Sequence, residues 1–225
     1  MKKLLAMLAL AAFAVPAFAT DPPGTPSAEK QCRDQRTSIG AQAFKDLYGT
    51  NHNKSNAFGK CVSKTNKTLD QNANEANSSC KTEQAADPDA FKDKYGTNKN
   101  KSNAYGKCVS AQAKAADQED QSNTINAAKQ CKAERKLDPD AFKNKYGTNK
   151  NKNNAFGKCV SAQAKAADQE DQSNTINAAK QCKAERKEDP AAFKDKYGTN
   201  KNKRNAFGKC VSAKAKAQHD SPPAP

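Results

Sequence analysis

Apolar side chains in this chain are grouped into four short segments separated by long polar ones. In the second segment Phe91 and Tyr95 stand four residues apart. Tyr105, Cys108 and Val109 follow at the i, i+3, i+4 spacing of one helical face. All aromatic residues beyond position 19 lie in such segments, at fixed offsets from cysteines. This pattern predicts short helices whose aromatic side chains pack in small cores, rather than forming an exposed platform for stacking a ligand.

The cysteines show that the four segments are copies of one unit. Each copy reads C-x(9)-AF-x(3)-YGTN-x-N-K-x-N-A-[FY]-G-K-C, with one additional residue before AF in the first. The period is 51 residues, or 48 for the first copy, and residues 106–136 are identical to residues 157–187. This identity indicates a recent duplication. We place the four repeats at residues 28–63, 77–110, 128–161 and 179–213.

Local signals within one repeat predict a helix that carries the first cysteine, a short helix, a basic loop and a helix that carries the second cysteine. Asp87 followed by Pro88 has the form of an N-cap with proline at the first helical position, and this pair recurs in the third and fourth repeats. We expect Gly96 to end the short helix as a left-handed cap. Beyond the loop, Asn103 is placed to cap the next helix. The first repeat has Ser-Ile-Gly at residues 38–40 in place of Asp-Pro.

The linkers between repeats are residues 64–76, 111–127 and 162–178, and they contain neither Gly nor Pro. They are polar on nearly every face, which predicts helices that bridge the units through solvent or connectors that are partly frayed. The run DQSNT within them leaves a turn open as an alternative. The fold class expected is therefore all-α, with small helical units on an elongated chain. The Pro-rich segments predicted to be disordered are residues 20–27 and 214–225.

Eight cysteines in a chain with an export signal predict disulfides. Repeat symmetry leaves two schemes, one within units and one across linkers, as in Cys108 with Cys131. A helix of 23 residues would separate its ends by about 34 Å, whereas a disulfide needs Cα atoms within about 7 Å. Unless DQSNT is a turn, the pairs are Cys32 with Cys61, Cys80 with Cys108, Cys131 with Cys159, and Cys182 with Cys210. A unit of this size also needs such a staple, because burial alone stabilises it too little.

The first 19 residues, MKKLLAMLALAAFAVPAFA, have the features of a bacterial export signal. Two lysines precede an apolar run, which ends in the small-residue site Ala-Phe-Ala. The first cysteine, Cys32, lies well beyond this site, which argues against a lipid anchor. No later apolar run approaches the ~18 residues that a transmembrane helix needs. We expect an exported protein, periplasmic or extracellular, without a transmembrane segment.

Charge narrows the class of partner. Removal of residues 1–19 leaves 37 basic and 24 acidic side chains, a net charge of +13. The positive charge is concentrated in the repeats and gathers in loops that precede helix N-termini, where anions are favoured. Lysine outnumbers arginine in these loops, so point-charge attraction fits better than bidentate recognition. The candidate anion-binding residues are Lys54, Lys99, Lys101, Lys150, Lys152, Lys201, Lys203 and Arg204.

The sequence contains no motif that indicates catalysis or metal binding. His52 and His219 are the two histidines, and neither has a partner at catalytic or metal-ligand spacing. The cysteines are too far apart for C-x(2–4)-C zinc pairs, and no G-x-S-x-G, H-E-x-x-H or P-loop sequence occurs. The carboxylates of DPDAFKD stand at a helix start, where capping accounts for them. We therefore expect a protein that is not an enzyme and has no cofactor, metal or catalytic residue.

The run AF-x(3)-YGTN…NAFGKCVS, with a cysteine 28 residues before its own, resembles a short two-cysteine repeat that recurs in exported bacterial proteins of uncharacterised function. The resemblance covers the four repeats, roughly half of the mature chain, and implies no catalytic residues. With no sequence-specific nucleic-acid motif present, the charge pattern favours weak, multivalent, non-specific binding to anionic polysaccharide, envelope polymer or nucleic acid. Two alternatives remain: a structural spacer or surface-display protein without a ligand, and a cysteine-rich inhibitor or toxin-like effector.

Overall fold

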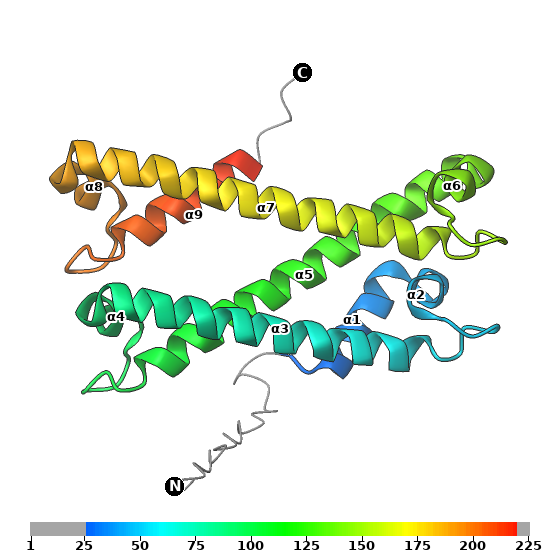
Figure 1. Ribbon diagram of the computed structural model, residues 1–225, viewed down its shortest axis with the longest axis horizontal. Coiled ribbons are helices and arrows are strands. Elements are labelled where there is room, and N and C mark those ends of the chain that lie inside the picture. The colour runs from blue at the N-terminus through cyan, green and yellow to red at the C-terminus, as the bar shows by residue number, and fades with distance from the viewer. Residues whose placement is uncertain (1–25, 220–225) are drawn as a thin grey trace, which may run out of the picture.

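The computed structural model describes residues 26–219, which form nine helices and no strand (Figure 1). The export signal, residues 20–25 of the first expected tail and residues 220–225 of the second lie outside these residues. Residues 214–219, expected to be disordered, instead continue the last helix. The helices are α1 (Ala28–Ile39), α2 (Ala41–Tyr48), α3 (Ala57–Ala86), α4 (Pro88–Tyr95), α5 (Ala104–Leu137), α6 (Pro139–Tyr146), α7 (Ala155–Glu188), α8 (Pro190–Tyr197) and α9 (Ala206–His219).

The expected all-α fold of disulfide-stapled units is confirmed. Helix α5 runs through the DQSNT stretch without a turn, so the linkers are continuous helices. All four disulfides close within units, each with Cα atoms 6.0 Å apart. Each of α3, α5 and α7 carries the second cysteine of one unit and the first cysteine of the next. We number these units 1 to 4 in chain order.

The long helices do not bridge the units alone through solvent, as the polar linker sequence led us to expect. Instead α3 packs against α5, α5 against α7, and α7 against α9, so the chain folds back on itself (Figure 1). Successive units therefore lie at opposite ends of the molecule. Units 1 and 3, with α2 and α6, form what we call the joined end. Units 2 and 4, with α4 and α8, form the divided end.

Small and polar side chains hold the long helices together along what we call the linker seam. Ala113 and Ala128 of α5 are almost completely buried, which lets neighbouring backbones approach closely. The Asn72 amide of α3 donates to Asp117 Oδ1 at 2.7 Å and to Asp120 Oδ2 at 2.8 Å, both on α5. A buried polar group stabilises a fold only when it is hydrogen-bonded, and these pairs meet that condition.

The same arrangement recurs 51 residues later, between α5 and α7. The Asn123 amide donates to Asp168 Oδ1 at 2.7 Å and to Asp171 Oδ2 at 3.4 Å. Two acidic pairs thereby come together in the middle of the molecule. Burial raises the pKa of Glu119, and the carboxylates of Asp171, Asp120 and Asp168 raise it further. Ionisation of this cluster at neutral pH therefore acts against the packing of the long helices.

The cores of the two ends differ. At the joined end, units 1 and 3 share one buried core that contains both of their disulfides and the side chains of Phe44, Phe142 and Phe156. At the divided end the cores of units 2 and 4 remain separate, each with one disulfide, one phenylalanine and one alanine as its buried residues.

A departure from the repeat accounts for part of this difference. Leu47 of unit 1 stands where unit 2 has Lys94, and its side chain packs against the joined core. A Cβ added at Gly157 of α7 would lie 3.5 Å from the Leu47 carbonyl oxygen, so α2 approaches α7 closely. In unit 2 the Lys94 ammonium group pairs at 2.6 Å with Glu83, which unit 1 replaces with Gln35. Unit 1 thus replaces an ion pair within the unit by an apolar contact with unit 3.

Candidate functional site in the paired loops

Each basic loop turns the chain sharply between a short helix and the following long one. Contrary to expectation, Gly96 is not a left-handed cap, because its φ is −71° and its ψ is 122°. The left-handed residue is Lys101, with φ 55°, and the corresponding lysine of every unit shares this conformation. A Cβ on Gly96 would lie 2.4 Å from the Lys101 Cβ. Glycine is therefore required at position 96 because Lys101 leaves no room for a side chain there, and not because of the backbone angles of Gly96.

The asparagine expected to cap the long helix stabilises the loop instead. Asn103 occupies the N-cap position, yet its side chain makes no capping hydrogen bond. Its Oδ1 accepts from the Thr97 backbone N–H at 3.0 Å, and its Nδ2 donates to Thr97 Oγ1 at 2.7 Å. The other three units repeat these bonds. The expected N-caps of the short helices are confirmed, since the Asp87 carboxylate accepts from the Ala90 N–H at 3.0 Å.

The second lysine of each loop is engaged within its own unit. Lys54 pairs with Asp46 of α2 at 2.6 Å. Lys101 and Lys203 pair in the same way with the corresponding aspartates, and Lys152 donates to Asn144, which replaces that aspartate in unit 3. A lysine that is already paired attracts an external anion less strongly. Four of the seven lysines predicted from sequence as anion-binding residues therefore serve the loop itself.

At the joined end the same aspartate also connects two units. Arg135 of α5 donates to Asp46 Oδ2 at 2.7 Å, and its guanidinium lies 4.5 Å from the centroid of the Phe156 ring. Burial acts to raise the pKa of Asp46, but hydrogen bonds from Lys54 and Arg135 outweigh it, so the pKa is lowered. Asp46 is therefore held ionised between two cations that belong to different units.

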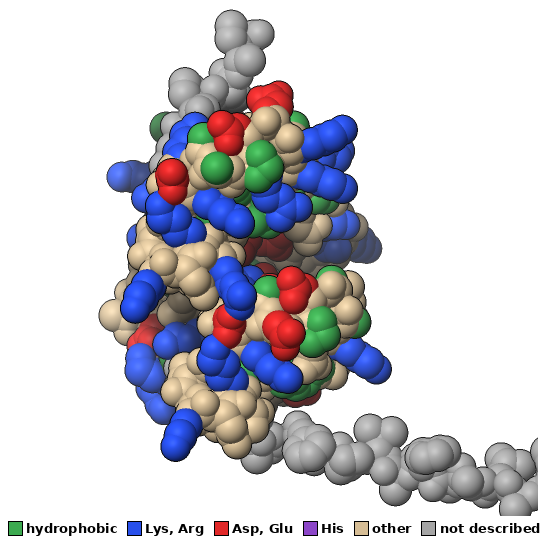
Figure 2. Space-filling model, turned by 90° about the vertical axis from the view of Figure 1, so that its left-hand side faces the viewer, with side chains coloured by type: hydrophobic (Ala, Val, Ile, Leu, Met, Phe, Trp, Pro, Cys, Tyr) green, Lys and Arg blue, Asp and Glu red, His purple; other side chains and the backbone are tan. Residues whose placement is uncertain are grey.

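The first lysine of each loop projects into solvent. Lys99, Lys150 and Lys201 are exposed, and His52 takes this position in unit 1. Figure 2 looks onto the divided end, where Lys and Arg side chains surround units 2 and 4 with a hollow between them. Arg204 of unit 4, also predicted from sequence, pairs with Asp93 of unit 2. The first lysines are therefore exposed, whereas the second lysines and Arg204 are paired with side chains of the protein.

The aromatic side chains lie in the cores, and the tyrosine hydroxyls donate to glutamate, glutamine or asparagine. The Phe91 and Tyr95 rings have centroids 5.0 Å apart, and Phe91 is buried. The Tyr95 hydroxyl donates to Glu83 Oε2 at 2.9 Å. In unit 1 the Tyr48 hydroxyl donates to Gln35, and burial raises the pKa of Tyr48 to about 12. These rings hold the units together.

Each end has a groove lined by residues of both of its units. The joined-end groove has a volume of about 590 Å³ and is bordered by the loops of units 1 and 3 and the start of α7. The divided-end groove has a volume of about 310 Å³ and is bordered by α4, α8 and the residues around Arg204. Sequence reasoning missed both grooves, because each requires the pairing of units that are not adjacent in the chain.

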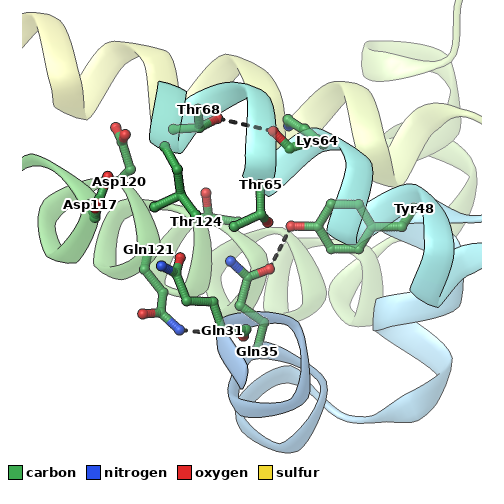
Figure 3. Close-up of a pocket in the computed structure, with 11 residues that line it drawn as sticks. Gln31, Gln35, Tyr48, Lys64, Thr65, Thr68, Asp117, Asp120, Gln121 and Thr124 are labelled. Carbon is green, nitrogen blue, oxygen red and sulfur yellow. Dashed lines mark hydrogen bonds between the residues drawn. The ribbon is translucent and has the colours of Figure 1, made fainter. Parts of the chain in front are cut away.

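A third cavity lies among α1, α3 and α5 and is too small for a substrate (Figure 3). Its volume of about 40 Å³ leaves room for a few water molecules. Its walls are mainly polar, and the Gln121 amide donates to the Gln31 backbone carbonyl at 3.4 Å. We interpret the cavity as part of the polar packing of α1 against the long helices.

Within residues 26–219, no three His, Cys, Asp or Glu side chains are placed to share a metal ion. Over the same range, no helix has the length and apolar character needed to cross a bilayer. The sequence matches no protein-family model and no curated protein, and the structure matches no solved one.

Proposed function

We propose that this protein is a non-enzymatic, exported binder of anionic polymers. Its weak contacts come from the exposed basic side chains of the loops, and its partners are envelope polysaccharide or extracellular nucleic acid. The observation that carries the proposal is the placement of the first lysines. Lys99 and Lys201 project from the divided end, and Lys150 projects from the joined end, where His52 occupies the corresponding position.

Two further features support this function. The four disulfides indicate an oxidising environment outside the cytoplasm, where anionic envelope polymers occur. The long helices pack on one another and fix the positions of the two ends. A polymer chain can therefore contact several loops at once. Linked weak sites gain affinity because the second contact forms at high effective concentration.

Salt-dependent binding tests the proposal. Affinity for heparin and for single-stranded DNA should fall linearly on a log–log plot against salt concentration. Replacing the three first lysines with alanine should lower the salt slope by roughly one for each lysine that no longer meets an anionic group. The substitutions are Lys99→Ala, Lys150→Ala and Lys201→Ala.

A matched control removes the same charge away from the ends. The variant carries Lys67→Ala, Lys114→Ala and Lys165→Ala, one exposed lysine from each long helix. If the effect depends on position, this control keeps the wild-type slope. Equal slopes for the two triple variants would show that net charge alone attracts the polymer, and would overturn the assignment to the loops.

A structural spacer without a ligand is the second candidate. It is favoured by the internal bonding of the loops, in which asparagine side chains and the second lysines already have partners. Such a loop is explained as a joint that turns the chain. Absence of binding to any polyanion at low salt would favour this candidate and rule out the first.

A further inference from the structure

The groove at the joined end has walls from two units that are far apart in sequence. One wall is the loop of unit 1 and the other is the loop of unit 3 with the first turns of α7. Its volume of about 590 Å³ is nearly twice that of the groove at the divided end, about 310 Å³. The described side chains that line it are Asp46, Leu47, Thr50, Asn51, His52, Lys54, Asn149, Asn151, Asn153, Asn154, Lys158 and Ser161.

This lining is unusually rich in uncharged hydrogen-bonding groups. Amide and hydroxyl side chains make up most of it, and Lys158 and His52 add exposed nitrogen groups at the rim. The single carboxylate among the lining residues, Asp46, already receives hydrogen bonds from Lys54 and Arg135. The amides of Asn51 and Asn154 bond within their own loops. The groove therefore offers a ligand chiefly the side chains of Asn149, Asn153 and Ser161, together with the charge of Lys158.

Both walls are held in shape before any ligand arrives. In unit 1 the Asn56 Oδ1 accepts from the backbone N–H groups of Thr50 and Asn51, at 3.0 and 3.4 Å. In unit 3 the Thr148 backbone N–H donates to Asn154 Oδ1 at 3.1 Å. Because the loops are already ordered, binding at their surface costs little additional conformational entropy.

The loop copies differ from one another at positions that line the grooves. His52 replaces the lysine that the other three units have, and it lines the joined-end groove. Asn153 and Arg204 stand where units 1 and 2 have a serine, and these two residues line the grooves of the two ends. The corresponding Ser102 instead accepts a hydrogen bond inside its own loop, from Asn98 Nδ2 at 2.9 Å. Variation among the copies thus changes the groove surfaces while the loop framework is kept.

The chemistry of the lining indicates the class of ligand. Amide and hydroxyl groups match the hydroxyl groups of a sugar, and Lys158 with His52 at the rim matches a sugar carboxylate. No Phe, Tyr or Arg is among the described residues that line this groove, so it lacks the aromatic and guanidinium surfaces on which bases stack. We propose that the joined-end groove binds a short segment of an acidic polysaccharide built from sugar carboxylates. This inference rests on the proposed function. It narrows the partner to acidic polysaccharide and the binding site to the joined end of the molecule.

The test uses the folded, oxidised chain and a tetrasaccharide of galacturonic acid as the probe. Wild-type protein should bind this probe more tightly than a neutral glucose tetrasaccharide or a thymidine tetranucleotide. Lys158→Glu reverses one charge at the groove and should weaken binding about tenfold, because a like charge then faces the ligand. Lys107→Glu makes the same change at the equivalent exposed position of unit 2, outside either groove, and should leave the affinity within about twofold of wild type.

The possible results separate this inference from the function on which it rests. Polyanion binding that Lys158→Glu and Lys107→Glu weaken equally would keep the proposed function and overturn the groove. Tighter binding of the thymidine tetranucleotide would overturn the ligand class. Failure of the wild-type protein to bind any of these anions at low salt would overturn both. Unchanged far-UV circular dichroism of both variants would confirm that the comparison is made on folded protein.

Discussion

The joined and divided ends are built from the same repeat, yet their units are held together differently. Units 1 and 3 share a continuous core, and Arg135 links them through Asp46. Units 2 and 4 keep separate cores, and the ion pair between Arg204 and Asp93 connects their surfaces. A few substitutions within a repeat therefore decide whether stacked units fuse or remain independent. The stability of each unit at the divided end must therefore depend more on its disulfide than the stability of units 1 and 3 does.

Removing disulfides should produce the largest difference between the ends. Closing a loop of 28 residues contributes about 3–4 kcal/mol in the chain-entropy model, whichever unit is considered. Unit 4 has few other buried groups, so the double variant Cys182→Ala, Cys210→Ala should lose the amide protection of α8. The double variant Cys131→Ala, Cys159→Ala should keep α6 protected, because the shared core remains. Hydrogen exchange followed by mass spectrometry measures both.

Equal loss of protection in α6 and α8 would contradict the view that the shared core compensates for a missing staple. The wild-type protein in its oxidised form is the reference for both double variants. The same hydrogen-exchange experiment should show that α3 and α5, which lie outside unit 4, keep their wild-type protection when the Cys182 pair is removed.

Exchanging one residue between units should sharpen the comparison with a smaller effect. Leu47→Lys gives unit 1 the residue of the other units and places a charge against the joined core. We expect the free energy of unfolding to fall by about 2 kcal/mol, because apolar packing is removed and a charge is desolvated. The reciprocal change, Lys94→Leu, removes a partly exposed ion pair with Glu83 and should cost less than about 1 kcal/mol.

Urea denaturation measures both changes, and the m-value checks that the folded state keeps its compactness. A larger loss of stability for Lys94→Leu than for Leu47→Lys would mean that ion pairs within units, rather than apolar contact between units, stabilise the ends. The divided end would then be the better stabilised of the two.

The two ends should also differ in their response to acid. Asp46 has a folded-state pKa below its ordinary value of 3.8. Its contribution is therefore fully present above that pH and is lost as the pH falls through the lowered pKa. Asp46→Asn should cost about 1–2 kcal/mol at pH 7, and this cost should shrink below about pH 4. Thermal unfolding at a series of pH values measures the change.

Asp195→Asn is the matched change at the divided end. The Asp195 side chain is 71% exposed and pairs with Lys203 alone among the described residues. Its loss should change stability by less than about 0.5 kcal/mol at any pH. A cost for Asp46→Asn that stays constant down to pH 3 would show that the side chain acts through its shape and hydrogen bonds, and not through its charge.

Much of a single unit could be predicted from the sequence, because the signals are local. The disulfide pairs, the Asp87 cap with Pro88, and the packing of Phe91 on Tyr95 all follow from spacing within about 30 residues. The role of Gly96 was predicted wrongly, since a glycine after a helix is usually explained by its backbone freedom. Here glycine is required because the Lys101 Cβ lies where a side chain at position 96 would stand. The two residues come this close only in the folded loop.

The assembly of the units could not be predicted in the same way. The bond from Asn72 to Asp117 joins residues 45 positions apart on helices that each look solvent-exposed in sequence. Polar linkers are usually solvated, so their mutual packing had no hydrophobic signature. One signal was present: Leu47 and Gln35 replace the lysine and glutamate of the later units together. Such paired departures within a repeat can indicate a contact outside the unit.

The back-and-forth path of α3, α5 and α7 has a consequence for how this protein can evolve by duplication. The distance between its two ends is set by the length of one long helix, about 45 Å for the 30 residues of α3. A further copy of the 51-residue repeat therefore thickens the molecule by one layer and leaves its span unchanged. It also reverses the end at which the chain stops. In this architecture the number of repeats sets the thickness of the molecule and the end at which the chain stops. The distance between the two ends depends on linker length alone.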